Sequence, residues 1–185
     1  MSKTVFITGA SSGIGKETAK LFQRNGWNVV ATMRTPQKET ELNQLANVIC
    51  LRLDVCDSES IHAAIMEACK QFGRIDVLIN NAGYGLIGAF ETFSGEQIER
   101  QFQTNVFGLM EVTRAMLPHF RHNRQGTIIN VTSFAGRSTV PLYSVYHASK
   151  WAVEGFSDSL AFELEQFGIR VKIIEPGTIK TDFWG

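Results

Sequence analysis

A glycine-rich segment follows the first apolar run of the chain and leads into an amphipathic segment. Its glycines are spaced G-x-x-x-G-x-G, which allows a tight turn and lets a pyrophosphate approach the backbone. A helix N-terminus directly after such a turn offers unpaired N–H groups and the positive end of a dipole. A turn that binds nothing is the plainer alternative. The residues expected to bind phosphate are Gly9, Ser11, Ser12, Gly13, Ile14 and Gly15.

The same loop also matches a hydrolase pattern. Residues 9–13 read G-x-S-x-G, the nucleophile elbow, with an apolar run before them and a helical pattern after them. That chemistry needs an acid and then a histidine downstream, presented at the end of a strand. The histidines are His62, His119, His122 and His147, and none of them directly follows a predicted strand. The hydrolase interpretation is therefore disfavoured.

Short apolar runs alternate with amphipathic segments along the whole chain. The runs predict strands at residues 4–7, 27–32, 48–53, 75–79, 127–131 and 169–174. Apolar spacing of about 3.6 residues predicts helices at 14–25, from 57 to 72, in a long segment after 94 and at 143–167. This alternation predicts a Rossmann-like, doubly wound parallel sheet in three α/β/α layers, with strands covered on both faces. Ligands bind such sheets beyond the C-terminal strand ends.

Composition excludes several classes of protein. The chain has 185 residues, 18 Lys+Arg against 18 Asp+Glu, and 44% hydrophobic residues, so we expect one folded domain over residues 1–185. The charge balance lacks the basic footprint of a nucleic-acid binder. No apolar run is long enough to span a membrane, and we see no signal peptide. Three cysteines without a C-x-x-C pair predict free thiols, no metal site and a cytoplasmic location.

Further motifs follow the glycine loop in order. They are Asp54-Val55 after the third strand, Asn80-Asn81-Ala82-Gly83 after the fourth, Asn105 in the long helix, Ser133 after the fifth strand, Tyr146-His147-Ala148-Ser149-Lys150, and Pro176-Gly177 after the sixth. Together with the spacing from Thr8 to Gly15, this set resembles the short-chain dehydrogenase/reductase family over the whole chain. The resemblance implies a nicotinamide cofactor and hydride transfer. It assigns Asp54 and Val55 to the adenine ring, and it adds Asn81, Ala82, Gly83, Pro176 and Gly177 to the cofactor site.

The family usually continues past this Pro-Gly pair through a substrate-covering segment, another helix and a seventh strand. This sequence stops at Gly185. We therefore expect the substrate lid and the last strand of the sheet to be missing from it.

Tyr146 and Lys150 are four residues apart and so share one helix face. A tyrosine titrates at about 10, and a neighbouring ammonium favours the phenolate. Lys150 and an oxidised nicotinamide together would lower the pKa of Tyr146 until it moves the proton while the cofactor moves the hydride. A lone pair of this kind also fits an ordinary amphipathic helix. The flanking motifs favour the catalytic interpretation, in which both residues also contact the cofactor.

Two further polar residues complete the expected catalytic set. Ser133 would hydrogen-bond the substrate oxygen and orient it, without nucleophilic attack. Thr132 and Ser138 are nearby alternatives, but the family spacing favours Ser133, which otherwise is a strand-end turn residue. Asn105 is a polar residue on an inward helix face, where buried amides need partners. It either braces a neighbouring loop or holds a water that connects Lys150 to solvent, and the two roles are compatible.

The end of the second strand bears on cofactor choice. An NAD enzyme usually places an acid there for the ribose 2′-OH, whereas a nearby arginine accommodates the 2′-phosphate of NADP. Met33 takes the acid position and Arg34 follows it. Against this, the basic residue that the family often has before the middle glycine is replaced by Ser12, and Arg34 also fits a solvated surface charge. We expect NADP(H) in preference to NAD(H).

The sequence thus predicts an NADP(H)-preferring oxidoreductase that acts on a secondary alcohol or ketone. The alternatives are an NADP(H)-binding regulatory or sensor protein without turnover, and a non-functional fragment. An apolar substrate is indicated by Leu86, Ile87, Phe90, Phe134, Val140 and Leu142.

Small residues also line one face of the helix that carries Tyr146. They are Ala148, Ala152, Gly155 and Ser159, at steps of four and three. The apolar stripe of this helix already serves the core, so the small face is left for another helix. Packing against the chain's own long helix is one possibility. Related enzymes commonly pair through this helix, and we expect a homodimer or homotetramer.

Overall fold

The structure is a computed structural model, and it describes residues 2–179. The elements are β1 (Thr4–Ile7), α1 (Gly13–Arg24), β2 (Asn28–Met33), β3 (Val48–Arg52), α2 (Ser58–Phe72), β4 (Val77–Asn80), α3 (Gly95–Phe102), α4 (Leu109–Asn123), β5 (Gly126–Val131), α5 (Ser144–Glu165) and β6 (Ile169–Ile174). Short turns of helix lie between them: η1 (Pro36–Lys38), η2 (Leu42–Gln44), η3 (Phe90–Thr92), the π-helical η4 (Gln103–Gly108) and η5 (Phe134–Gly136).

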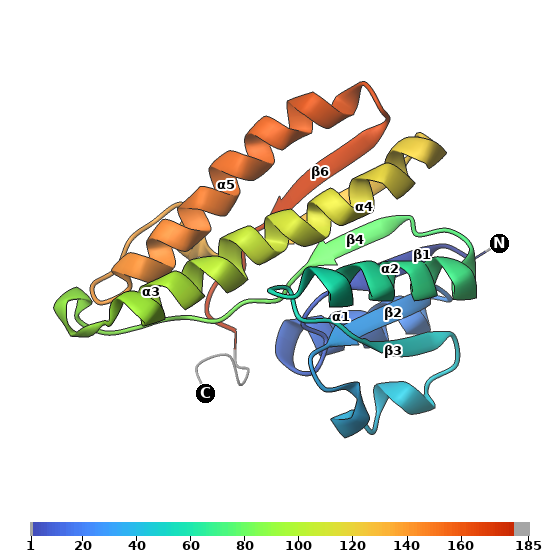
Figure 1. Cartoon of the computed structure of the whole chain (residues 1–185), viewed down its shortest axis with the longest axis horizontal. Helices are drawn as coiled ribbons and strands as arrows, with labels where there is room; N and C mark the ends of the chain where they lie inside the picture. Colours follow the sequence, from blue (N-terminus) through green and yellow to red (C-terminus); the bar gives the residue numbers. More distant parts are fainter. Residues whose placement is uncertain (1, 180–185) are drawn as a thin grey trace.

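The strands form one parallel sheet in the order β3-β2-β1-β4-β5-β6. The chain therefore reverses its winding direction between β1 and β4, where ligands bind in doubly wound sheets. All strands end at the same edge of the sheet, the lower left edge in Figure 1. The Rossmann-like parallel fold predicted from the sequence is confirmed. The prediction that the substrate lid and the last strand are missing concerns the chain after residue 179 and lies outside the described residues.

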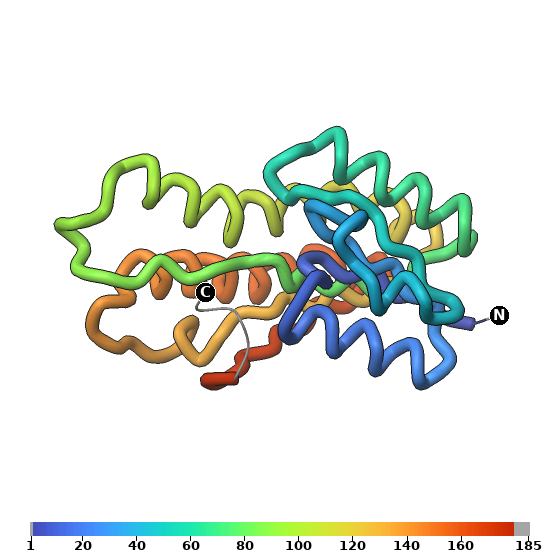
Figure 2. The backbone as a smooth tube through the Cα atoms, turned by 90° about the horizontal axis from the view of Figure 1, so that it is seen from below, coloured from blue at the N-terminus to red at the C-terminus, as the bar shows by residue number. Residues whose placement is uncertain are grey.

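Two hydrophobic clusters hold helices against the two faces of this sheet. One contains fully buried residues such as Phe6 and Phe120 and joins the strands to α2, α4 and α5. The other contains Val5 and Val29 and joins them to α1. Figure 2 shows α1 on one side of the sheet and α2 and α4 on the other. Each large buried apolar side chain stabilises this arrangement by about 1.5–3 kcal/mol.

The strand β6 pairs with β5 and is the last strand among the described residues. It forms one edge of the sheet, and its burial alternates along the strand. Ile169 and Val171 pack into the cluster that includes α5, whereas Arg170 and Lys172 are exposed on the other face, and Ile174 is 49% exposed.

The long helix predicted after Ser94 is a rod of three parts. Ser94 and Gln97 form a capping box that starts α3, which satisfies N–H groups that the first turn leaves unpaired. After α3 the helix continues through the π-helical turn η4 and then as α4 (Figure 1). The π-helical turn brings Asn105 and Gly108 inward, and a Cβ on Gly108 would lie 2.7 Å from Val55. Helical periodicity alone did not reveal this extra residue in the turn.

Candidate active site

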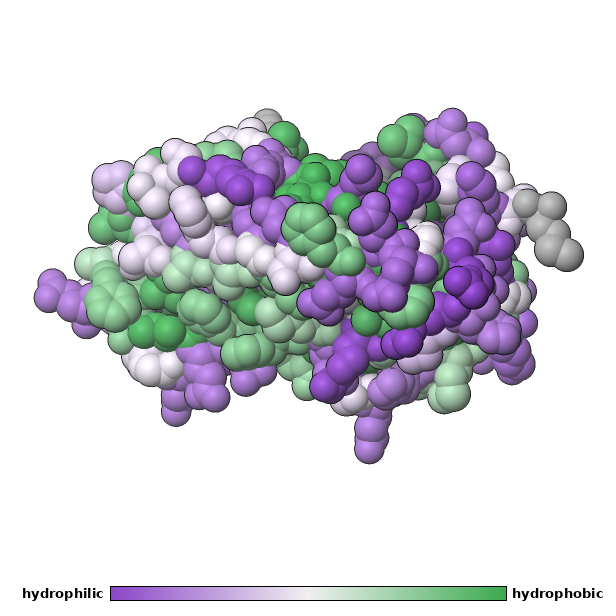
Figure 3. Space-filling view, turned by 90° about the horizontal axis from the view of Figure 1, so that it is seen from above, coloured by the Kyte–Doolittle hydropathy of each residue, from purple (hydrophilic) through white to green (hydrophobic). Residues whose placement is uncertain are grey.

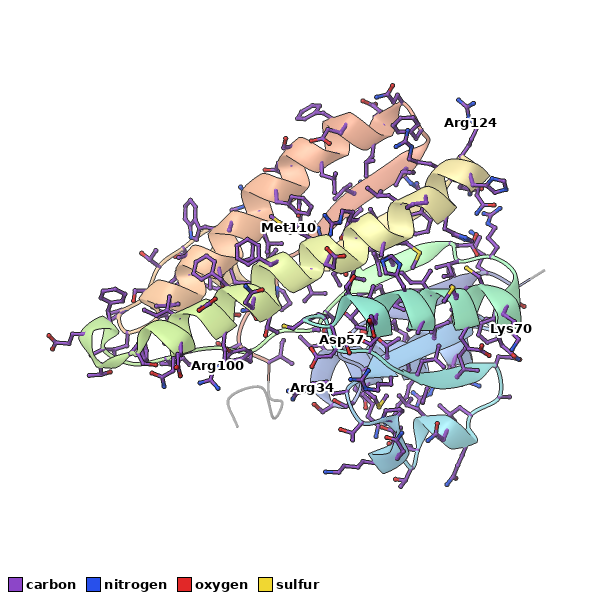
Figure 4. The ribbon with its side chains drawn as sticks, viewed as in Figure 1. Arg34, Asp57, Lys70, Arg100, Met110 and Arg124 are labelled. Carbon is purple, nitrogen blue, oxygen red and sulfur yellow. The ribbon has the colours of Figure 1, made fainter. Side chains whose placement is uncertain are left out.

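A cavity of about 540 Å³ opens beyond the C-terminal ends of the strands. It runs from the glycine loop, past the end of β4, to α5 and the segment after β6. Figure 4 labels Arg34 at this edge of the sheet. Of the residues expected from the sequence, those that line the cavity are Gly9, Ser11, Ser12, Gly13, Ile14, Arg34, Asp54, Val55, Asn81, Ala82, Gly83, Ser133, Tyr146, Lys150, Pro176 and Gly177. Gly15 and Asn105 lie behind its wall.

Backbone contacts fix the shape of the glycine loop. Gly9 and Gly13 have φ values of 66° and 53°, a region that L side chains rarely adopt. A Cβ on Gly9 would lie 2.8 Å from the Cα of Ala82, and one on Gly15 would lie 2.3 Å from the carbonyl oxygen of Gly9. The loop therefore needs glycine at Gly9 and Gly15 for close backbone packing and at Gly13 for its conformation.

Two side chains hold the glycine loop in place. Thr8 directly follows β1, and Asn81 directly follows β4. The Thr8 hydroxyl accepts hydrogen bonds from the backbone N–H groups of Asn81 and Ala82, at 3.0 and 3.1 Å. The Asn81 side chain donates to the carbonyl oxygens of Thr8 and Gly9, at 3.0 and 2.9 Å. Asn81 thus positions the loop as well as lining the cavity, a role that the resemblance alone did not indicate.

The first turn of α1 is well suited to an anion. Ser12 is its N-cap, yet its side chain makes no capping hydrogen bond, and the first turn carries no acidic residue. The N–H groups and dipole of this turn therefore face the cavity beside Gly13 and Ile14. The chemistry of this donor set fits the diphosphate of a nicotinamide dinucleotide.

Charges beyond the end of β2 are arranged unequally. Lys16 pairs with the buried Glu39, at 3.0 Å, and Lys20 with Glu41 at 2.5 Å. These hydrogen bonds raise the pKa values of both lysines, so their charges are already balanced. Arg34, by contrast, is exposed and lines the cavity. It is the basic side chain that the described part of this wall offers to a bound phosphate.

The end of β3, the strand next to β2 in the sheet, also lines the cavity. Val55 is buried and packs against Gly108, while Asp54 accepts a hydrogen bond from the Cys56 N–H at 3.0 Å. Asp57 caps α2 by accepting from the Ser60 N–H. These local bonds hold the apolar Val55 and the polar Asp54 at the site where the resemblance places an adenine ring.

The expected catalytic side chains converge at the other end of the cavity. Tyr146, Lys150 and Ser133 are all buried and all line it. The Lys150 ammonium donates to the carbonyl oxygen of Val131 at 3.0 Å and lies 5.8 Å from the centre of the Tyr146 ring. A hydrogen bond links the Tyr146 and Ser133 side chains, and Ser133 also accepts from the Ala135 N–H at 3.2 Å.

The protein side chains by themselves do not lower the pKa of Tyr146, an effect that the prediction assigned to Lys150 and an oxidised nicotinamide together. Burial raises the pKa of Tyr146 above its usual value, although the hydrogen bond with Ser133 opposes this. Burial also lowers the pKa of Lys150 to about 8, against the opposing charge of Glu154. Desolvation penalises both charged forms, so the protein side chains by themselves favour a neutral phenol. Sequence spacing gives the distance along a helix but not the degree of burial.

Asn105 acts as a loop brace in this structure. It is buried, and its side-chain oxygen accepts from the Tyr84 N–H at 3.1 Å. Its side-chain nitrogen donates to the Tyr84 carbonyl at 2.9 Å and to the Ser149 hydroxyl at 3.4 Å. These bonds fix the segment after β4 against α5. A relay role for Asn105 remains a prediction.

The sequence did not predict the roles of several other polar residues in this region. The Asn80 side chain donates to Thr113 and to Asn130, and Asn130 donates to Ser157, at distances of 2.8–2.9 Å. This buried chain of bonds ties β4 and β5 to α4 and α5, directly below the catalytic group. Only the pairing of Asn80 with Asn130 across the sheet could have indicated it.

A second cavity lies on the outer side of Tyr146. Its volume is about 380 Å³, and it is lined by Ile87, Phe134, Ala135, Val140, Tyr143, Tyr146 and Thr178. Of the apolar set expected for the substrate, Ile87, Phe134 and Val140 lie in this wall, and Phe134 lines both cavities. Phe90 and Leu142 are more than half exposed nearby in sequence, and Leu86 is partly buried.

Comparison with known proteins identifies the family. The short chain dehydrogenase family matches residues 3–185. The chain belongs to this family. Among relatives, the 3-ketodihydrosphingosine reductase of Bacteroides thetaiotaomicron is 41% identical over 179 residues, which cover 97% of this chain and 65% of the relative. The chain spans 64–65% of the length of the first curated relatives that it matches.

Several solved structures that are similar to this chain contain a nicotinamide cofactor. ElxO with NADP bound is 34% identical, with a TM-score of 0.93 over 100% of this chain and 77% of that one. The 3-ketoacyl-(acyl-carrier-protein) reductase of Brucella melitensis, complexed with NADH, is 29% identical, with a TM-score of 0.94 over 98% of this chain and 78% of that one. Neighbours of this chain therefore bind either form of the nicotinamide cofactor.

Residues 2–179 contain neither a candidate membrane span nor a candidate metal site. No helix in this range is both long enough and apolar enough to cross a bilayer. The same range contains no group of three His, Cys, Asp or Glu side chains that could hold a metal ion.

Proposed function

We propose that this chain contains the cofactor site and catalytic group of an NADP(H)-preferring oxidoreductase that interconverts a secondary alcohol and a ketone. The observation that carries the proposal is the lining of one cavity by an anion-binding glycine loop at one end and by Ser133, Tyr146 and Lys150 at the other. A bound nicotinamide supplies or accepts the hydride in this chemistry.

The side chains of this protein would handle the proton and the substrate oxygen. Ser133 orients that oxygen by a hydrogen bond, and Tyr146 donates its proton to it or removes one from it. Lys150, whose pKa is about 8, exchanges protons near neutral pH and sits one helical turn from Tyr146. Asn105 would connect this group to solvent through a water, in addition to its bonds to Tyr84.

The preference for NADP(H) rests on the end of β2. Met33 provides no carboxylate for a ribose 2′-OH, and Arg34 lines the cavity with its charge exposed. The neighbouring Lys16 and Lys20 are already paired with Glu39 and Glu41. Arg34 is therefore the residue proposed to bind the 2′-phosphate.

The proposed substrate is an apolar alcohol or carbonyl compound, held in the second cavity against Phe134 and Val140. The acting form is proposed to be a cytoplasmic homodimer, or a homotetramer that contains this dimer. Figure 3 views the side on which α5 lies in Figure 1, and hydrophobic residues gather over one half of this face. Along α5, Ala148, Gly155 and Ser159 are exposed, as is Trp151, whereas Ala152 is partly buried and packs against a cluster that includes Val106 and Leu109 of the chain's own long helix.

The dimer has a simple test. A Cβ on Gly155 meets nothing within 4 Å, so Gly155→Arg fits the single chain but would place a long charged side chain against its own copy across a two-fold axis. Light scattering should then find a dimer for the wild type and a monomer for the variant. A wild-type protein that is monomeric at high concentration would contradict the assembly.

The activity is tested by following NADPH oxidation at 340 nm with a panel of ketones of increasing chain length. We expect turnover that improves with apolar length, slower turnover with NADH, and turnover about 10³-fold lower with Tyr146→Phe. Tight NADPH binding without oxidation by any ketone would contradict the proposed function.

A further inference from the structure

His147 follows Tyr146 directly on α5, and its ring is buried. One ring nitrogen, Nε2, lies 2.9 Å from the backbone nitrogen of Val140, and the other, Nδ1, lies 2.8 Å from the carbonyl oxygen of Ala135. A backbone N–H can only donate, so Nε2 must be the acceptor. The proton of the ring is therefore on Nδ1, which donates to Ala135, and the imidazole is neutral.

The two backbone groups that His147 binds belong to one segment, residues 134–143, which we call the substrate wall. It consists of η5 and the loop that leads to α5. It supplies Phe134, Ala135, Val140 and Tyr143 to the second cavity. The wall departs from regular structure, since Leu142 has a φ of 70°. Its apolar side chains are also exposed, with Val140 at 38% and Leu142 at 58%.

Backbone hydrogen bonds hold the two ends of the far half of this wall, and the Tyr143 ring also contacts His147. Before it, the N–H groups of Arg137 and Ser138 bond back to Phe134 within the first turn. After it, the Gly88 N–H donates to the carbonyl oxygen of Leu142 at 2.9 Å. The imidazole of His147 contacts the wall between these two groups of bonds. It joins the turn at Ala135 to the loop at Val140. It thereby sets the distance between two stretches of backbone that face the substrate.

We propose that His147 is a positioning residue for the substrate, acting by holding Val140 and Ala135 at a fixed separation from Tyr146. This rests on the proposed function for the choice of ligand, and it adds a determinant of substrate affinity that lies outside the catalytic group. The bond from the Val140 N–H carries the effect, because an unpaired N–H in the wall lets this stretch move away from the cavity.

The test compares variants that keep or lose this bond. His147→Phe keeps a ring but accepts no hydrogen bond, whereas the side-chain oxygen of His147→Gln can accept from Val140. The matched control is His119→Phe, because His119 on α4 also accepts a backbone N–H bond, from Ile75 at 3.0 Å, but lies away from both cavities. The readouts are hydrogen exchange at the Val140 amide, the Kd of 2-decanone for the NADPH-loaded chain, and kcat at saturation.

His147→Phe should speed exchange at Val140 and weaken 2-decanone binding about tenfold, which equals about 1.4 kcal/mol. Its kcat at saturation should change less than about twofold, and His147→Gln should restore both exchange and affinity. His119→Phe should lower the melting temperature without changing the Kd. An unchanged Kd in His147→Phe, equal losses in kcat and affinity, or no ketone binding by the wild type would each overturn the proposal. Ketone binding without turnover would instead contradict the proposed function alone.

Discussion

The two ends of the active-site region are held in place by different means. On the cofactor side, meaning the glycine loop with Thr8 and Asn81, backbone atoms pack against backbone atoms, and a single methyl group would collide with Ala82 or Gly9. On the substrate side, meaning the wall of residues 134–143, exposed apolar side chains sit on an irregular segment fastened by an imidazole.

This difference suits the ligands that we propose for the two sides. A diphosphate has one shape and charge, so a backbone cradle that tolerates no side chain is an effective way to recognise it. An apolar substrate is recognised by the shape of side chains, which can change without disturbing the sheet. We therefore expect substitutions on the cofactor side to damage binding and folding together, and those on the substrate side to alter affinity alone.

The largest effect is expected where the two sides meet. Tyr146→Phe removes the proposed proton donor and keeps the ring, so turnover should fall by about 10³-fold, within the range for general acid–base groups. NADPH affinity and melting temperature should stay near wild type, because the ring still packs. The rate is measured by NADPH oxidation. A variant that kept more than a few per cent of the rate would remove Tyr146 from the mechanism.

The buried ammonium of Lys150 gives a pH-dependent stability. Burial holds its pKa at about 8 in the folded chain, below the value of 10.5 for an exposed lysine. Between these pH values the unfolded chain binds more protons, so the free energy of unfolding rises with pH. Below pH 8 Lys150 is charged in the folded chain, and burying this charge lowers the free energy of unfolding. This loss of stability disappears as the pH rises from 8 to 10.5.

Lys150→Met removes that titration. The free energy of unfolding of the wild type, relative to this variant, should therefore increase by about 3 kcal/mol from pH 8 to pH 10.5. Urea unfolding of both proteins across this range measures it. Parallel stability curves for the two proteins would show that Lys150 is not desolvated in the folded chain.

Next in size is a test of the cofactor side by a matched pair of glycines. Gly9→Ala forces a left-handed backbone on a side chain and pushes it into Ala82, so stability should fall by at least about 2 kcal/mol and NADPH affinity with it. Gly95→Ala, at the start of α3, meets nothing within 4 Å and should be neutral or stabilising by up to about 1 kcal/mol. Similar results for both variants, by thermal melting and calorimetry, would contradict the backbone-cradle account.

The smallest effect concerns a side chain at the rim of the same side. Arg34→Ala should weaken NADPH binding about tenfold or more, because a hydrogen bond to a charged group contributes about 1.5–3 kcal/mol. NADH binding should change little in this variant. The double variant Met33→Asp with Arg34→Ala should bind NADH in preference to NADPH. Titration of the wild type with both cofactors comes first. Tighter binding of NADH by the wild type would reject Arg34 as the determinant.

Much of the fold was predictable because its causes are local. The strand β1 was predicted with the bounds that it has, and the helix predicted from 57 to 72 is α2, which Asp57 caps. Asn105 shows the limit of such reasoning. Its inward position on a helix was readable, but its bonds to Tyr84 and Ser149 join residues 21 and 44 positions apart, and no periodicity reports them.

The sequence by itself determined the alternation of strands and helices, the glycine loop and the one-turn separation of Tyr146 from Lys150, because each depends on neighbours within a few residues. Only the tertiary structure decided which groups lose contact with water. Desolvation raises the pKa of Tyr146 and lowers that of Lys150, opposite to what the pair alone suggests for the phenol. It likewise made His147 a buried link rather than an exposed helix residue. Burial depends on every layer packed around a residue, so it is a property of the assembled fold.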